Sequence, residues 1–187
     1  MDSFHTLIKQ VCKDNSYESF KLLHKELLNR GVRFNYDPWD SSSNRIIFYT
    51  CKNVGVKNKN WSFTKHCNGL IMDYKTWKVL CYPPMVSNFV YNHSTVNDNY
   101  KSYTVHKAYN GTTVNLYHHC GKWTLSTLRG MDVSKSTMRG ITFSNALTDT
   151  AKLIGSDWNL SNDKLDTSKS YTFGFNNPIF NKAEILL

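Results

Sequence analysis

The sequence has no apolar run approaching the roughly 20 residues that a transmembrane helix needs, so we expect no membrane-spanning segment. Its first residues, Met-Asp-Ser-Phe-His, lack the basic start and the continuous apolar stretch of a signal peptide. The five cysteines are odd in number and include no Cys-x-x-Cys pair, which argues against a disulfide framework and against a zinc site. We therefore expect a soluble, cytoplasmic protein whose cysteines are reduced core thiols.

The chain does have enough apolar residues for one compact globular domain, since 40% of its 187 residues are hydrophobic and 14% are aromatic. Its formal net charge of +9 favours a polyanionic partner, because lysines and arginines that face phosphates gain affinity by counterion release. The basic residues are scattered along the chain, which favours a groove formed by the fold over a basic tail. RNA, DNA or a nucleotide is the expected partner.

The first residues of the chain place apolar side chains at helical spacing. Residues 2–12 form one predicted amphipathic helix, which Asp2 or Ser3 could cap. A second helix follows, with Asn15 and Glu18 spaced like a capping box and Gly31 as its C-terminal stop. Residues 1–35 are therefore expected to form N-terminal helices.

After a predicted loop at 36–43 the chain becomes rich in β-type segments, which makes 45–187 a mainly β core. Tight connections at 73–76 and 119–121 predict antiparallel hairpins, and helical spacing recurs at 143–155. The fold class is therefore α+β. The predicted strands are 45–51, 69–74, 78–82, 103–107, 112–118, 122–128 and 171–175.

The most informative segment is Lys-Ala-Tyr-Asn-Gly at 107–111, where a lysine lies three residues ahead of an Asn-Gly turn between two β-type runs. Glycine at such a turn lets a nucleotide approach the backbone, and a lysine beside it can be a nucleophile. Other interpretations of Lys107 are a surface lysine next to a hairpin turn and a lysine that contacts RNA.

Several segments resemble, in order, the motifs of the RNA ligase 1 type of covalent nucleotidyltransferase, which includes phage RNA ligases and tRNA ligases. Residues 67–73 and 82–85 look like the family's upstream hairpin, and 107–111 is similar to its lysine motif, Lys-x-(Asp, Asn or His)-Gly. Ser-Thr-Leu-Arg-Gly at 126–130 takes the place of a Ser-Lys-Gly element. Tyr-Thr-Phe-Gly-Phe-Asn-Asn-Pro at 171–178 resembles the Phe-x-Glu-Phe-x-x-Pro strand.

This resemblance covers roughly residues 60–182 and implies an antiparallel β-sheet nucleotidyltransferase core, of the ATP-grasp-like ligase kind, within a single domain of residues 1–187. It implies ATP and Mg²⁺ as cofactors and RNA as partner. Lys107 would take AMP from ATP, release pyrophosphate and pass AMP to an RNA 5′-phosphate.

The resemblance also implies roles for the residues around Lys107. Asn110 would hold the ribose, and Gly111 would allow the nucleotide to come close. Arg129 would contact phosphate, and Phe175 would stack on the base. His106, next to the nucleophile, completes the expected nucleotide-binding residues. Arg129, Lys122 and Mg²⁺ could lower the pKa of the lysine from about 10.4, which an attacking amine requires.

The chain also departs from the family pattern. Asn68 stands where a phosphate-contacting arginine is expected, Pro83 replaces a second arginine, and Gly174 replaces a glutamate used on the ribose. The sequence stops at Leu187, before two further strands of the family, so we expect a C-terminally incomplete core or a protein partner that supplies the missing motifs. Two alternatives remain open: a catalytically degenerate module that binds RNA, nucleotide or protein, and a GTP-dependent RNA guanylyltransferase.

A metal site and a Cys-His catalytic pair are weaker hypotheses. Adjacent residues on a strand point to opposite faces, so one metal cannot easily bind both His118 and His119. No third group at a recognisable spacing would orient His66 beside Cys67. We expect no metal bound by protein side chains.

Overall fold

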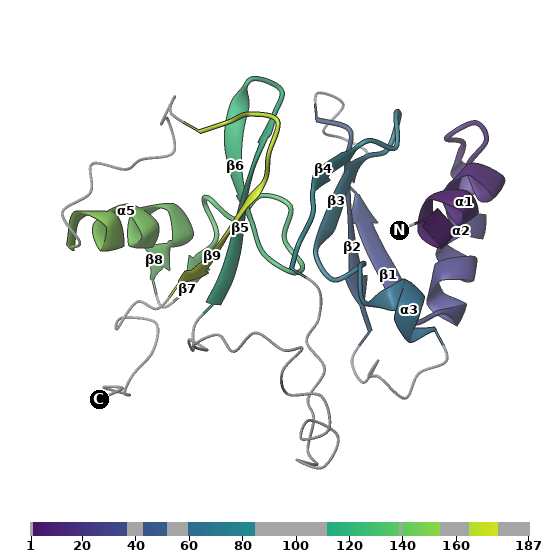
Figure 1. The fold of residues 1–187 in the computed structure, drawn as a ribbon, viewed down its shortest axis with the longest axis horizontal. Helices are drawn as coiled ribbons and strands as arrows, with labels where there is room; N and C mark the ends of the chain where they lie inside the picture. Colours follow the sequence, from purple (N-terminus) through teal and green to yellow (C-terminus); the bar gives the residue numbers. More distant parts are fainter. Residues whose placement is uncertain are drawn as a thin grey trace, which may run out of the picture.

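The computed structural model describes residues 2–36, 43–51, 60–84, 112–138, 140–153 and 165–175. In these ranges it combines helices with antiparallel sheets, which confirms the predicted α+β class. Figure 1 shows the layers in order: helices α1 and α2, a first sheet, a second sheet, and helix α5. None of the helices in these ranges combines the length and apolar character needed to cross a bilayer.

Two helices begin the chain, as predicted: α1 spans Asp2–Val11 and α2 spans Tyr17–Asn29. The predicted Asn15 capping box is wrong. Ser16 is the N-cap, and its Oγ accepts a hydrogen bond from the Ser19 backbone N at 3.2 Å, while Asn15 has a left-handed φ of 53°. The predicted stop at Gly31 is confirmed, since its φ is 80° and its N–H donates to the Leu28 carbonyl.

The first sheet has the order β1-β2-β3-β4, with every neighbouring pair antiparallel. Its strands are β1 (Val32–Tyr36), β2 (Arg45–Thr50), β3 (Leu70–Asp73) and β4 (Val79–Cys81). The short helix α3 (Trp61–Thr64) precedes β3. Strand β1 corrects two predictions, because it enters both the helical segment 1–35 and the loop 36–43. The alternation of apolar and polar residues in Val32–Tyr36 indicates a strand, but the helical spacing of the residues just before it concealed this pattern.

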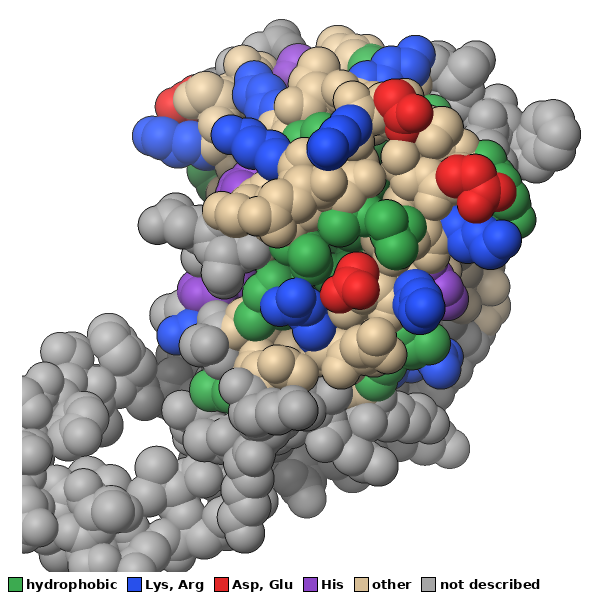
Figure 2. Space-filling view, turned by 90° about the vertical axis from the view of Figure 1, so that its right-hand side faces the viewer, with side chains coloured by type: hydrophobic (Ala, Val, Ile, Leu, Met, Phe, Trp, Pro, Cys, Tyr) green, Lys and Arg blue, Asp and Glu red, His purple; other side chains and the backbone are tan. Residues whose placement is uncertain are grey.

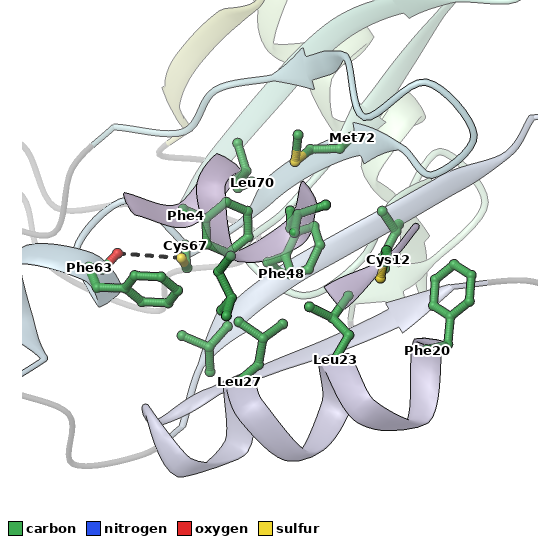
Figure 3. Packing of buried hydrophobic residues seen from close by; sticks show 14 residues of the cluster. Phe4, Cys12, Phe20, Leu23, Leu27, Phe48, Phe63, Cys67, Leu70 and Met72 are labelled. Atoms are coloured by element: carbon green, nitrogen blue, oxygen red, sulfur yellow. Dashed lines mark hydrogen bonds between the residues drawn. The ribbon is translucent and has the colours of Figure 1, made fainter. Parts of the chain in front are cut away.

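Helices α1 and α2 cover one face of the first sheet and bury a large apolar core (Figure 3). The ring of Phe4 from α1 meets that of Phe48 from β2 edge to face, with centroids 4.9 Å apart. Leu23 and Leu27 from α2 are fully buried in the same cluster. Packing of one helix stripe against one sheet face therefore holds this half together.

The second sheet has the order β6-β5-β9, again antiparallel. It consists of β5 (Thr112–His119), β6 (Lys122–Ser126) and β9 (Tyr171–Phe175), while β7 (Thr137–Met138) and β8 (Ile141–Thr142) pair separately before α5 (Phe143–Leu153). The predicted β5–β6 hairpin is confirmed, with positive φ at both turn residues, Cys120 and Gly121. The predicted strand 103–107 lies outside the described residues.

The two sheets meet through a buried contact between β2, β3 and β4 of the first and β5 of the second. Ile47, Ile71, Cys81 and Tyr117 form this cluster. Within it Arg45 Nη1 donates to the Tyr117 hydroxyl at 2.8 Å, and that hydroxyl donates to the Met131 carbonyl at 2.8 Å. The sheets are thus joined by side-chain packing and hydrogen bonds at one end of the interface.

The expectation of reduced core thiols holds for three cysteines. Cys12, Cys67 and Cys81 are free and buried, and burial raises the pKa of the Cys67 thiol to about 12. It is wrong for Cys120, which is exposed in the hairpin turn, and Cys51 is half-buried.

Candidate functional site

The predicted nucleophile Lys107 and its neighbours His106, Asn110 and Gly111 lie outside the described residues. The chain after them is described from Thr112, the first residue of β5. Strand β5 is central in the second sheet, between β6 and β9. The predicted lysine motif therefore leads directly into the middle of a sheet.

Two other predicted segments reach the same end of that sheet. Strand β9 runs antiparallel to β5, so Phe175 pairs with Thr112, and the Phe175 backbone lies beside the residue that follows Gly111. Strand β6 also runs antiparallel to β5, and Arg129 follows its last residue, Ser126. The fold thus brings together the backbone of Phe175, the segment of Arg129 and the strand that follows the lysine motif.

The first sheet contributes the segment before β3, which contains Asn68, and the segment after β4, which contains Pro83. Gly69 has a φ of +95° and packs so closely that a β-carbon on it would lie 3.2 Å from Leu128 Cα and 3.6 Å from Pro83 Cβ. The side chain of Asn68 accepts a hydrogen bond from Thr50 Oγ1 at 3.2 Å. We call the group at these strand ends the strand-end cluster, consisting of Tyr49, Asn68, Gly69, Pro83, Leu128 and Arg129.

Arg129 supplies a positive charge to the strand-end cluster. Its side chain is exposed, and its guanidinium carbon lies 5.8 Å from the centroid of the Tyr49 ring. Such a cation–π contact orients a guanidinium while leaving its N–H donors available to phosphate. Arg129 is therefore an exposed cation within the strand-end cluster.

Lys122 does not belong to this group. It pairs with His119 beside the hairpin turn, at the opposite end of β5 from Thr112. The seven-residue step between Thr112 and His119 corresponds to about 23 Å of strand. Lys122 therefore lies at the far end of β5 from the residue that directly follows the lysine motif.

The face of β5 that is turned toward the first sheet carries polar side chains. Val114 and Leu116 pack on the α5 side, so alternation places Asn115 and Tyr117 on the side of the first sheet. Asn115 is fully buried and its Oδ1 accepts from Thr172 Oγ1 at 2.8 Å, but its Nδ2 has no hydrogen-bond partner within the described ranges. A buried amide donor of this kind can bind a polar ligand group.

Gly174 shares this face, since Thr113 is its register partner. Apart from its chain neighbours, no atom of the described residues lies within 4 Å of where a β-carbon on Gly174 would be, so these residues leave space for a side chain there. Tyr117 lies on the same face of β5. Burial is the largest cause that raises the pKa of its hydroxyl, to about 12, so the hydroxyl keeps its proton.

The histidine and cysteine hypotheses find no support. His119 Nε2 donates to the Ser43 carbonyl, whereas the His118 ring packs edge-on against Trp123, so the two histidines do face apart. The raised pKa keeps Cys67 as a thiol, which excludes it as a thiolate nucleophile at neutral pH. Within the part of the chain that the structure describes, no three His, Cys, Asp or Glu side chains gather to hold a metal ion.

Sequence reasoning missed Tyr49 and Asn115. Tyr49 comes from β2, outside the segments that resemble the family, and no motif marks it. Asn115 is the one asparagine in an alternating strand, and its placement on the inter-sheet face follows from β-periodicity once the strand start is known. No protein-family model, no curated protein and no solved structure matches the chain.

Proposed function

We propose that this chain is an RNA ligase-like nucleotidyltransferase that forms a lysyl-AMP on Lys107 from ATP and acts on RNA 5′-phosphate ends. One observation carries the proposal: segments far apart in the sequence, each similar to a family motif, meet at the same strand ends of two facing sheets. The segments that meet there contain the start of β5, Arg129, the backbone of Phe175, Gly69 and Pro83. Unrelated packing does not require this convergence.

In the proposed reaction the Lys107 amine attacks the α-phosphorus of ATP, the bond to the β-phosphate breaks, and pyrophosphate leaves. Arg129 neutralises charge on the phosphates, because it is exposed and oriented by Tyr49. Asn110 holds the ribose, and Asn115 Nδ2 offers a further buried donor. Mg²⁺ would be held chiefly by the substrate phosphates, as this ion prefers.

The decisive experiment incubates the full chain with α-labelled ATP and Mg²⁺ and follows label through denaturing electrophoresis. We expect a covalent adduct that Lys107→Ala abolishes. Lys122→Ala is the matched control, because it removes another lysine at the far end of β5 and should keep the label. Label from GTP alone would indicate a guanylyltransferase.

Two further variants test the site around Lys107. Arg129→Ala should reduce adduct formation roughly 100- to 1,000-fold, in line with removal of a single transition-state contact. Gly174→Glu should increase it, because the side chain has open space and restores the ribose-binding carboxylate of the family pattern. If neither variant changes adduct formation, the nucleotide does not bind next to Arg129 and Gly174.

A second candidate function is a degenerate module that binds RNA without forming an adduct. Lys107 lies four positions before Gly111, one more than in Lys-x-(Asp, Asn or His)-Gly. In an extended chain that shift turns the side chain to the opposite face. Asn68, bonded to Thr50, and Gly174 also lack the groups of an active site. Absence of label with ATP and with GTP would reject both enzymes and leave this module.

A further inference from the structure

A groove of about 410 Å³ lies between α2 and the edge strand β1, on the helix-bearing side of the first sheet. Its volume falls in the range of about 300–1,000 Å³ that is typical of small-ligand sites. The second sheet lies across the first sheet from these helices (Figure 1). The groove is lined by the aromatic residues Tyr17, Phe34 and Tyr36 and by the polar residues Lys21, His24 and Asn35.

The aromatic lining includes one ring that is free to stack and others that are held in place. Tyr17 is 74% exposed at the start of α2, and no contact of its ring with another ring is found among the described residues. Tyr36 is fixed by stacking on Phe20, with centroids 4.9 Å apart and an interplanar angle of 18°. The Phe34 ring meets His24 edge to face. The groove thus has a rigid floor and an exposed aromatic platform at one end.

Lys21 contributes a positive charge to the described lining of the groove. Residues 17–36 contain four Lys or Arg and two Glu, and none of the described residues that line the groove is acidic. Glu18 lies 3.8 Å from Lys21, but both side chains are exposed, and such pairs are weak in water. Figure 2 shows that Lys and Arg side chains, interspersed with a few Asp and Glu side chains, border a band of hydrophobic side chains on this face of the molecule.

We propose that this groove binds a base of single-stranded RNA. Aromatic platforms beside cationic side chains are the common means of binding single strands, because every base has a face for stacking and every nucleotide has a phosphate. Tyr17 would stack on the base over the floor formed by Tyr36, and Lys21 would contact the adjoining phosphate. The site would hold an RNA strand away from the strand-end cluster, whether or not the chain transfers a nucleotide.

The test measures fluorescence anisotropy of a labelled single-stranded RNA with a 5′-hydroxyl, without nucleotide or Mg²⁺. Tyr17→Ala should weaken binding roughly fivefold or more, the loss expected for one stacked base. Tyr17→Phe should retain binding because the ring remains. Leu22→Ala is the matched control, since Leu22 is 49% exposed on the same helix but does not line the groove. Far-ultraviolet circular dichroism would verify that each variant keeps its helices.

Salt dependence gives a second, independent measurement. Lys21→Ala should reduce the slope of log affinity against log salt by about one, as loss of a single phosphate contact predicts. Equal affinity of Tyr17→Ala and Leu22→Ala, or no binding of single-stranded RNA at all, would overturn the proposal. Because the adduct experiment contains no RNA and this one contains no nucleotide, failure of one proposal is distinguishable from failure of the other.

Discussion

The two sheets bury different kinds of surface. Among the described residues, the first sheet buries a cluster of fourteen apolar residues under α1 and α2, whereas the corresponding cluster between the second sheet and α5 has five. The second sheet instead carries buried polar groups on its other face, including Asn115 and Ser126. The first half of the chain is therefore built for stability, and the second half places polar groups where the proposed chemistry needs them.

The largest expected effect comes from removing the same side chain from each core. Leu27→Ala in the first cluster should lower the free energy of unfolding by about 4 kcal/mol, and Leu125→Ala in the second by about 2.5 kcal/mol, because a smaller core collapses more easily around a cavity. Both leucines are fully buried, so the substitutions are matched. Urea denaturation measures both values, and an equal or reversed order would break the comparison.

A smaller effect is expected at the joint between the sheets. Tyr117→Phe removes the hydroxyl that accepts from Arg45 and donates to the Met131 carbonyl, and should cost about 2 kcal/mol because the partners stay buried. Tyr49→Phe is the control, since its hydroxyl bond to Asn35 is exposed and should contribute less than about 0.5 kcal/mol. Similar losses for the two variants would show that the joint does not stabilise the fold.

Helix caps should contribute equally in the two halves. Ser16 accepts from the Ser19 backbone N before α2, and Thr142 accepts from the Asn145 backbone N before α5, at 3.2 and 3.1 Å. Ser16→Ala and Thr142→Ala should each lower stability by about 1 kcal/mol in urea denaturation. Ser16→Asp keeps an acceptor and should restore most of the loss. A cap effect in only one half would show that the other helix is held by packing alone.

The smallest effect concerns two exposed carboxylates, one in each half. Hydrogen bonds from Ser19 and Ser16 lower the pKa of Asp14 to about 2, and bonds from Ser168 lower that of Asp166 to about 2. Since both folded-state values lie below the unfolded value of about 3.9, each group stabilises the fold above pH 4 and loses that contribution as the pH falls toward 2. Thermal midpoints of Asp14→Asn and Asp166→Asn between pH 5 and 2 should therefore show a weaker pH dependence. Unchanged pH profiles would contradict this assignment.

Local patterns predict most of the described elements. The helices at the N-terminus and after residue 143, six strands and two hairpin turns all follow from apolar spacing and turn residues. Strand β1 is not predicted by these patterns. Val32 and Phe34 come directly after α2, and the helical spacing of apolar residues in α2 hides the change to the alternation of a strand. Helix α3 has four residues, too few for helical periodicity to register.

The candidate site also has features that the sequence predicts and features that it does not. The order of the motif-like segments is readable from the chain, and the prediction that Arg129 contributes to a site came from that order alone. The partners of those segments were not readable, because Tyr49, Thr50 and Asn115 reach them only through strand pairing and the meeting of two sheets. For Lys122 the sequence distance from Lys107 is short, yet the hairpin carries it to the opposite end of β5.

The sequence by itself determined the class of fold, the position of most strands, the basic charge and the order of segments that resemble a nucleotidyltransferase. Each of these depends on local spacing or composition, which a chain carries without reference to distant residues. Only the tertiary structure decided that Gly69, Pro83, Leu128 and the backbone of Phe175 lie at neighbouring strand ends, and that Asn115 keeps a buried donor there. The physical reason is that strand register and sheet packing arise from contacts between residues far apart in the chain, and no local pattern specifies them.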